Sequence, residues 1–218
     1  GAEMLWIPGI RMCDGIAADY AEKQKYLKFT HNFDDDILSA SRNMAKRYRC
    51  NTSHGQKIEN YALQIFDAMK KFHGLGTRER LLLRIASILH DCGKFISLRD
   101  SSACAYNIIM ATEIIGLSHA EREIVAEVVR CNLDAFRYGE GSIRAGKLTA
   151  MLRLANAMDR SHHGRLDDGK LQVKGNKLII STSYAGNLAL ETMAVEDKAD
   201  FFEEMFGLRP EIRQKRRV

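Results

Sequence analysis

Apolar and polar positions alternate with the period of an α-helix along most of the chain. From about residue 34, three aspartates suit a helix N-terminus, and apolar side chains then recur on one face. The next predicted helix opens with a capping box formed by Ser53 and Gln56, which puts His54 in its first turn. A third, over residues 78–91, is apolar nearly all round, so it should run through the middle of the domain and end at His90 and Asp91.

Further helices are predicted in the second half, and the period changes near the C-terminus. One helix should end near Gly116, the next should open with a capping box at Ser118, and a longer one should cover residues 143–159. After Gly164, alternating positions around the Gly175-Asn176 turn predict a hairpin, followed by a helix over residues 196–206 and a short terminal segment. At the other end, MLWIPGIRMCDGI (residues 4–16) predicts a short strand broken by turns.

These elements predict a mainly α fold, a helical bundle with a small C-terminal α+β appendage. An apolar fraction of 45% and only two prolines favour uninterrupted helices in a globular protein. We expect the helical domain to span residues 31–165 and the appendage to span residues 166–218. Residues 1–30 do not form a self-contained unit, and we interpret them as the trailing end of an upstream domain.

Composition narrows the cellular setting and the class of partner. The five cysteines are widely spaced and form no C-x-x-C pair, so we expect neither disulfides nor a structural zinc knuckle, and a cytoplasmic location fits best. No apolar stretch approaches a membrane span. The net charge of +5 includes a basic terminal run that lacks interleaved aromatic residues, so we expect no nucleic-acid partner.

Four side chains that commonly bind metals are predicted to face one interior. Asp159 continues an apolar helical stripe, and His54 and His90 lie on the buried faces of their helices, with Asp91 adjacent. Two imidazoles and two carboxylates suit one divalent ion such as Mn²⁺, Fe²⁺, Zn²⁺, Ni²⁺ or Mg²⁺. The alternative is a hydrogen-bonded polar network without metal, because buried polar groups need partners in either case.

Neighbouring residues suggest how a phosphate-containing substrate would be handled. Asp91 is the candidate to accept a proton from a metal-bound water, and Lys94 is the candidate to neutralise a phosphoryl oxygen. Arg160 and His162 are candidates for substrate binding. Simpler explanations stay open, because Lys94 also suits a helix C-terminus and Arg160 also suits a surface salt bridge.

The order His54, His90-Asp91, Asp159 resembles the signature of the HD phosphohydrolase superfamily. The segments HGLGTRERLLLRIASILHDCGKFIS, GLSHAEREI and LRLANAMDRSH are more closely similar to the C-terminal helical domain of the exopolyphosphatase/guanosine pentaphosphate phosphohydrolase family. The similarity covers roughly residues 30–215, and PGIRMCDGI resembles the end of that family's upstream actin-like phosphatase domain. The resemblance implies an HD-type helical domain and a metal-dependent phosphohydrolase acting on a phosphate ester, polyphosphate or another phosphoanhydride.

Two departures from the family limit this expectation. Histidines common in the family are absent from RDSSACAYN and from RCN, which ends at Asn132, so we expect one metal ion and not two. In the resembled family, hydrolysis is attributed to the upstream domain. The second hypothesis is therefore a non-catalytic domain that binds polyphosphate or a nucleotide, or that forms a homodimer, in the service of such an upstream domain.

Overall fold

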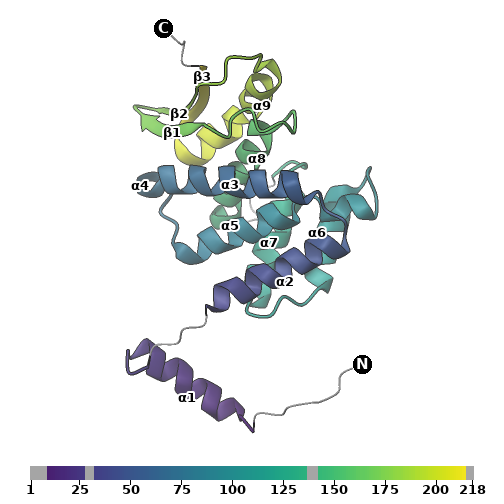
Figure 1. Ribbon diagram of the computed structural model, residues 1–218, viewed down its shortest axis with the longest axis vertical. Coiled ribbons are helices and arrows are strands. Elements are labelled where there is room, and N and C mark those ends of the chain that lie inside the picture. The colour runs from purple at the N-terminus through teal and green to yellow at the C-terminus, as the bar shows by residue number, and fades with distance from the viewer. Residues whose placement is uncertain (1–8, 28–31, 137–141, 215–218) are drawn as a thin grey trace.

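The chain folds into stacked helices that carry a small sheet at the C-terminal end (Figure 1). The computed structural model describes residues 9–27, 32–136 and 142–214. The predicted class, mainly α with a small C-terminal α+β part, is confirmed. In the part of the chain so described, no helix is long and apolar enough to span a membrane.

The bundle is built around α5 (Thr77–Leu89), which contacts helices on several sides. The other helices of the bundle are α2 (Phe33–Arg47), α3 (Thr52–Ala68), α4 (Lys70–His73), α6 (Ser101–Ala111), α7 (His119–Cys131) and α8 (Ile143–Met158). α5 packs against α2, α3, α7 and α8, and a short 3-10 helix, η1 (Cys92–Phe95), joins it to α6. Leu82, Leu83 and Ile85 are fully buried, which confirms the central position predicted from the apolar pattern.

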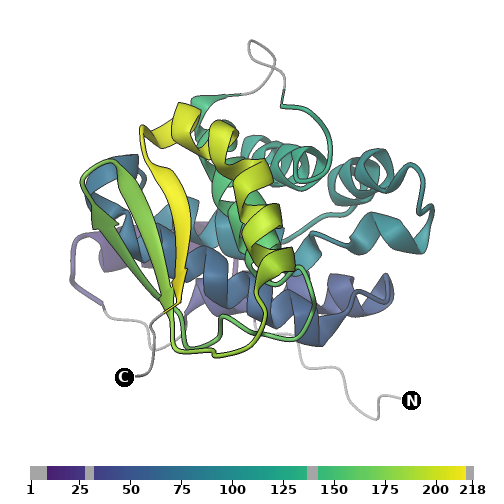
Figure 2. The same cartoon turned by 90° about the horizontal axis from the view of Figure 1, so that it is seen from above.

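The C-terminal unit combines a three-stranded sheet with one long helix (Figure 2). β1 (Lys170–Lys174) and β2 (Lys177–Thr182) form the predicted antiparallel hairpin. β3 (Arg209–Gln214) pairs with β2 in parallel, an arrangement that the local pattern did not predict. α9 (Ala189–Phe206) lies beside β3 and packs on α8, and it begins seven residues earlier than expected.

The prediction of a strand near the N-terminus is wrong where the structure describes it. Met12–Lys23 is a helix, α1, that buries none of its residues and lies apart from the bundle (Figure 1). Residues 4–8 of the predicted strand lie outside the described residues, as do residues 215–217 of the basic terminal run. The apolar side chains Met12, Ile16 and Tyr20 are spaced four residues apart, which suits one face of a helix as well as it suits a short strand.

Two helix boundaries also differ from the prediction. α3 is capped by Asn51, whose Oδ1 accepts a hydrogen bond from the His54 amide at 3.1 Å, and not by Ser53. Because Asn is as good an N-cap as Ser, the sequence pattern alone did not separate the two residues. α6 ends at Ala111, before Ile114, whereas Ser118 caps α7 as predicted.

Candidate functional site

Three helix termini bring the predicted site residues into one region. His54 lies in the first turn of α3, His90 is the C-cap of α5 and Asp159 is the C-cap of α8. All three are buried, with 4%, 5% and 0% of their surfaces exposed. The prediction that these three side chains face the interior is therefore confirmed, because packing of α3 against α5 and α8 joins the three termini.

His54 and Asp159 form a direct pair. Nδ1 of His54 lies 2.9 Å from Oδ2 of Asp159, and Oδ1 of Asp159 accepts a hydrogen bond from the Gly164 amide at 2.7 Å. Burial would raise the pKa of Asp159, but the bonds from His54 and Gly164 outweigh it and leave the pKa below its usual value. The ionised carboxylate therefore orients the His54 ring through a proton on Nδ1.

His90 has one ring nitrogen anchored and the other without a partner. Its Nδ1 donates to the Ser87 carbonyl at 2.7 Å. Its Nε2 is buried and has no hydrogen-bond partner among the described residues, and it lies 3.5 Å from Oδ1 of Asp91. Burial lowers the pKa of His90, which favours the neutral ring. In that form two lone-pair acceptors, His90 Nε2 and the Asp91 carboxylate, face each other, an arrangement that a cation or proton between them would stabilise.

Lys94 is the cation that now contacts Asp91. Its Nζ lies 2.6 Å from Oδ1 of Asp91, one turn along η1. Burial works to raise the pKa of Asp91, but the hydrogen bond and positive charge of Lys94 hold it below its usual value. Asp91 and Lys94 line a cavity of about 230 Å³ together with Tyr48, Arg49 and Phe95. An ionised carboxylate and two cations therefore border a space open to a small anion.

The structure brings His162 to the cluster but places Arg160 elsewhere. The His162 ring stacks on that of His54, with 3.8 Å between centroids, and its backbone adopts a left-handed φ of 60°. The rings of His54 and His90 are 5.3 Å apart. Arg160 is exposed and lines a separate cavity between α8 and α9, beside Asp197 and Lys198. Only His162 of these two predicted substrate-binding residues contacts the histidines.

Two imidazoles and two carboxylates are suitable ligands for a divalent ion, but in this structure the four side chains do not converge on one point. Within residues 9–27, 32–136 and 142–214, no group of three or more His, Cys, Asp and Glu side chains has an arrangement that would hold a metal. Both carboxylate oxygens of Asp159 accept hydrogen bonds, and the ammonium group of Lys94 forms an ion pair with Asp91. The partnerless Nε2 of His90 and its neighbouring carboxylate nevertheless form a donor pair suited to a transition metal.

Nearby thiols do not extend this donor set. Burial raises the pKa of Cys92 to about 12 and that of Cys50 to about 11. Both thiols are therefore protonated near neutral pH, whereas a metal needs the thiolate. Cys92 acts as a small apolar core residue, fully buried beside the end of α5.

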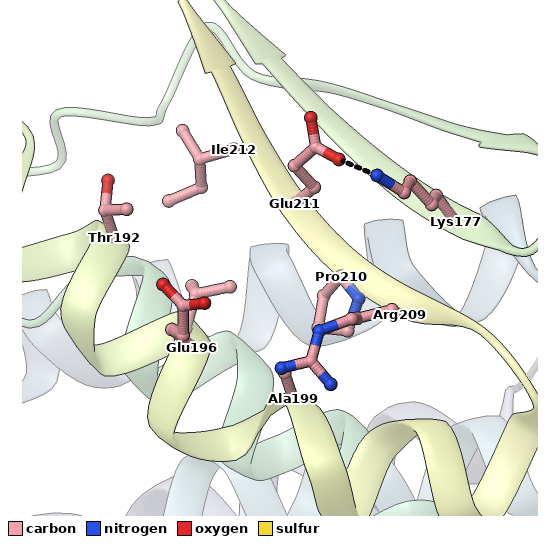
Figure 3. Close-up of a pocket in the computed structure, with 9 residues that line it drawn as sticks. Lys177, Thr192, Glu196, Ala199, Arg209, Pro210, Glu211 and Ile212 are labelled. Atoms are coloured by element: carbon pink, nitrogen blue, oxygen red, sulfur yellow. Dashed lines mark hydrogen bonds and ion pairs between the residues drawn. The ribbon is translucent and has the colours of Figure 1, made fainter.

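Another hollow, between α9 and β3, is lined by Lys177, Arg209 and Glu211, whose charges are paired, and by Glu196 (Figure 3). Glu211 accepts from Lys177 at 2.8 Å across the β2–β3 pair, and Arg209 bonds to Asp200 and Glu203 at 2.9 Å each. The Arg209 pairs join β3 to α9, and the Lys177–Glu211 pair joins the two strands. They account for the three charged residues Lys177, Arg209 and Glu211 of the lining without a ligand.

The sequence analysis did not identify some groups that position the cluster. These are backbone groups, or residues near a helix start that has more than one possible N-cap. The Ser87 carbonyl and the Gly164 amide orient His90 and Asp159, and backbone groups leave no sign in the sequence. Asn51 was a detectable signal, since a residue type that often caps helices stands two positions before the predicted cap, Ser53. Glu191, a fully buried carboxylate that accepts from the Ser161 amide at 3.3 Å, lies beside the loop that carries His162.

Comparison with known proteins agrees with the segments that carry the resemblance. A family model described as Ppx/GppA phosphatase, domain III, matches residues 38–197. The chain is also 22% identical over 200 residues to a guanosine-5'-triphosphate,3'-diphosphate pyrophosphatase from Photobacterium profundum. That alignment covers 89% of this chain and 39% of the relative, so the chain spans about two fifths of that protein's length.

Proposed function

The chain belongs to the Ppx/GppA phosphatase family, through domain III of that family, and from this premise we propose that it is a metal-dependent phosphohydrolase domain of the HD type. Its substrate would be a phosphate ester or a phosphoanhydride such as polyphosphate. One divalent ion would be held by His54, His90, Asp91 and Asp159. The observation that carries the proposal is the buried, partnerless Nε2 of His90, 3.5 Å from the Asp91 carboxylate.

The hydrogen bonds of the two histidines support the proposed metal ion. Each histidine has its Nδ1 bound by a carboxylate or a backbone carbonyl, a support that metal-ligating histidines usually have. When bound, a divalent ion would polarise a phosphoryl oxygen and lower the pKa of a coordinated water. Loading the site requires Lys94 to release Asp91, because its ammonium group now lies 2.6 Å from that carboxylate.

The chain's own residues then divide the remaining work. Asp91 has a depressed pKa and is ionised at neutral pH, so it can accept a proton from the attacking water. Lys94, 45% of whose side chain is exposed, borders the cavity beside Asp91 and would neutralise phosphoryl oxygens there. His162 would donate a hydrogen bond to the substrate from above the His54 ring.

A second function is favoured by the closed network in which Asp159 and Asp91 already take part. With both oxygens of Asp159 bonded and Asp91 neutralised by Lys94, the cluster is stable as a purely structural unit. The domain would then bind polyphosphate or a nucleotide without hydrolysing it. It would serve an upstream actin-like phosphatase domain or pair with a second copy of the chain.

A phosphatase screen of the 218-residue chain separates the two functions. p-Nitrophenyl phosphate and tripolyphosphate would be offered with Mn²⁺, Fe²⁺, Zn²⁺, Ni²⁺ or Mg²⁺. We expect hydrolysis with at least one ion, a loss of about 100-fold or more in Asp91→Asn, and no loss in Asp100→Asn, a matched change at an exposed loop aspartate. Absence of turnover with every ion, or equal turnover in both variants, would leave only the binding function.

A further inference from the structure

A separate cavity of about 590 Å³ lies between the ends of α7 and α8 and the first turns of α9. None of the four proposed metal ligands lines it. Its size is within the range of sites that hold small organic molecules. Its walls combine carboxamide groups, cations and apolar side chains, which is the mixture that such ligands require.

The first argument for a ligand is a buried amide without a partner. Asn132, the C-cap of α7, is only 4% exposed and lines the cavity, and its Oδ1 has no hydrogen-bond partner in the part of the chain that is described. A buried acceptor left unpaired destabilises the protein. A donor located in the cavity would satisfy it. The amide of Asn156 lines the same cavity.

The second argument is an excess of positive charge. Arg153, Arg160 and Lys198 line the cavity, and Asp197 is its one acidic lining residue among those described. Arg153 already donates to the Cys131 carbonyl at 2.7 Å and stacks over Phe201. Lys198 contacts Asp197 at 2.5 Å. Apart from the backbone bond of its amide to the Ala157 carbonyl, Arg160 has no hydrogen bond or ion pair with any described residue, so its guanidinium group is available to an anion.

The third argument is an exposed apolar rim on the same cavity. Leu133, Leu190 and Met193 line it and expose 56%, 55% and 71% of their surfaces. Such side chains gain free energy when an apolar body covers them. Inorganic phosphate would use the cations alone and leave this rim in water.

We propose that this cavity binds an organic phosphate monoester. Arg160 and Lys198 would hold the phosphate group, Leu190 and Met193 would cover the organic body, and Asn132 would accept a hydrogen bond from it. The site differs from the hydrolytic cluster and does not depend on it. It also gives Arg160 an anion-binding role at a place other than the one expected from the sequence.

Isothermal titration of the 218-residue chain with three probes tests the proposal. Phenyl phosphate and adenosine 5'-monophosphate should both bind more tightly than inorganic phosphate, and the tighter of the two esters identifies an aryl or a nucleoside body. Arg160→Gln should weaken both esters by about tenfold or more, whereas Arg47→Gln, the same charge change at an exposed site on α2, should leave them within about twofold.

Two further variants identify the site. Met193→Gln should weaken the esters and spare inorganic phosphate. Asp91→Asn should leave the Arg160-dependent part of ester binding unchanged, so a failure of the hydrolytic proposal is distinguishable from a failure of this one. Equal affinity for all three probes, or ester binding that Arg160→Gln does not change, would overturn the proposal.

Discussion

Nδ1 of His54 lies 2.9 Å from Oδ2 of Asp159, although the two residues are 105 positions apart in the chain. The contact joins the first turn of α3 to the residue that caps α8, and both side chains are almost excluded from water. It therefore ties the fold of the bundle to the geometry of the candidate site. A change that breaks this pair should be felt in stability as well as in function.

Replacing Asp159 by alanine should destabilise the protein strongly. The change leaves His54 Nδ1 and the Gly164 amide without their acceptor in a buried place, which should cost about 2–4 kcal/mol of unfolding free energy. Asp159→Asn keeps one carbonyl oxygen and should cost less. Urea unfolding of the three proteins measures the difference, and equal midpoints for wild type and Asp159→Ala would contradict the role given to this pair.

Gly93 permits a close approach that no other residue would allow. A Cβ at this position would lie 1.8 Å from the Ser101 carbonyl oxygen and 2.6 Å from the Ala105 nitrogen, both backbone atoms of α6. Gly93→Ala should therefore displace α6 from η1 and lower the unfolding free energy by about 2–4 kcal/mol. Gly55→Ala, in α3 with nothing within 4 Å, should be neutral or should stabilise by up to about 1 kcal/mol. Thermal melts showing similar effects for the two variants would refute this explanation.

The ion pair between Arg78 and Glu121 should make stability depend on acid pH. Bonds from Arg78, at 2.6 and 3.0 Å, lower the pKa of Glu121 from 4.5 to about 2, with help from the Ser118 amide. Because the folded-state pKa lies below the unfolded one, the contribution is complete above pH 4.5 and is lost as the pH falls towards 2. Glu121→Gln should therefore melt at a lower temperature than wild type at pH 7. The two melting temperatures should approach each other near pH 2, and a gap that stays constant with pH would argue against the linkage.

Glu191 should hold the loop that carries His162. Its Oε1 accepts from the Ser161 amide at 3.3 Å, and its Oε2 lies 3.7 Å from Nη1 of Arg165. The contact with Arg165 is an ion pair beyond hydrogen-bond range. We therefore assign the position of the loop mainly to the hydrogen bond from the Ser161 amide. Glu191→Ala should lose about 1–3 kcal/mol, while Glu191→Gln keeps an acceptor for Ser161 and should lose less. Proton NMR of the His162 ring, which stacks on His54, should shift in the alanine variant and recover in the glutamine variant; an unchanged spectrum in both would contradict the assignment.

The long, strongly periodic helices were predictable because their burial follows local spacing. α2, α5, α7 and α8 were placed within a few residues, and the buried faces of His54, His90 and Asp159 followed from the same spacing. The secondary structure of short segments was harder to predict from the sequence. The part of α1 up to residue 16 was predicted as a strand, because its apolar side chains stay unburied among the described residues and so show no clear helical burial pattern.

Non-local pairing and backbone hydrogen bonds were beyond the reach of the sequence pattern. β3 pairs in parallel with β2 across α9, and that choice depends on where the helix returns the chain. The Ser87 carbonyl sets the tautomer of His90, and no side chain signals it. Arg160 follows Asp159 directly, yet the chain turns there, so adjacency in sequence did not place it beside the histidines.

The central claim is that His54, His90, Asp91 and Asp159 hold one divalent metal ion. Elemental analysis of the chain, dialysed against Mn²⁺ or Zn²⁺ and then freed of excess ion, tests it most directly. We expect about one equivalent of metal in the wild type and in Asp100→Asn, and less than about a tenth of an equivalent in a folded His90→Asn variant, since the proposed site loses its partnerless donor. A wild-type chain without metal, or a His90→Asn variant that keeps a full equivalent, would contradict the account.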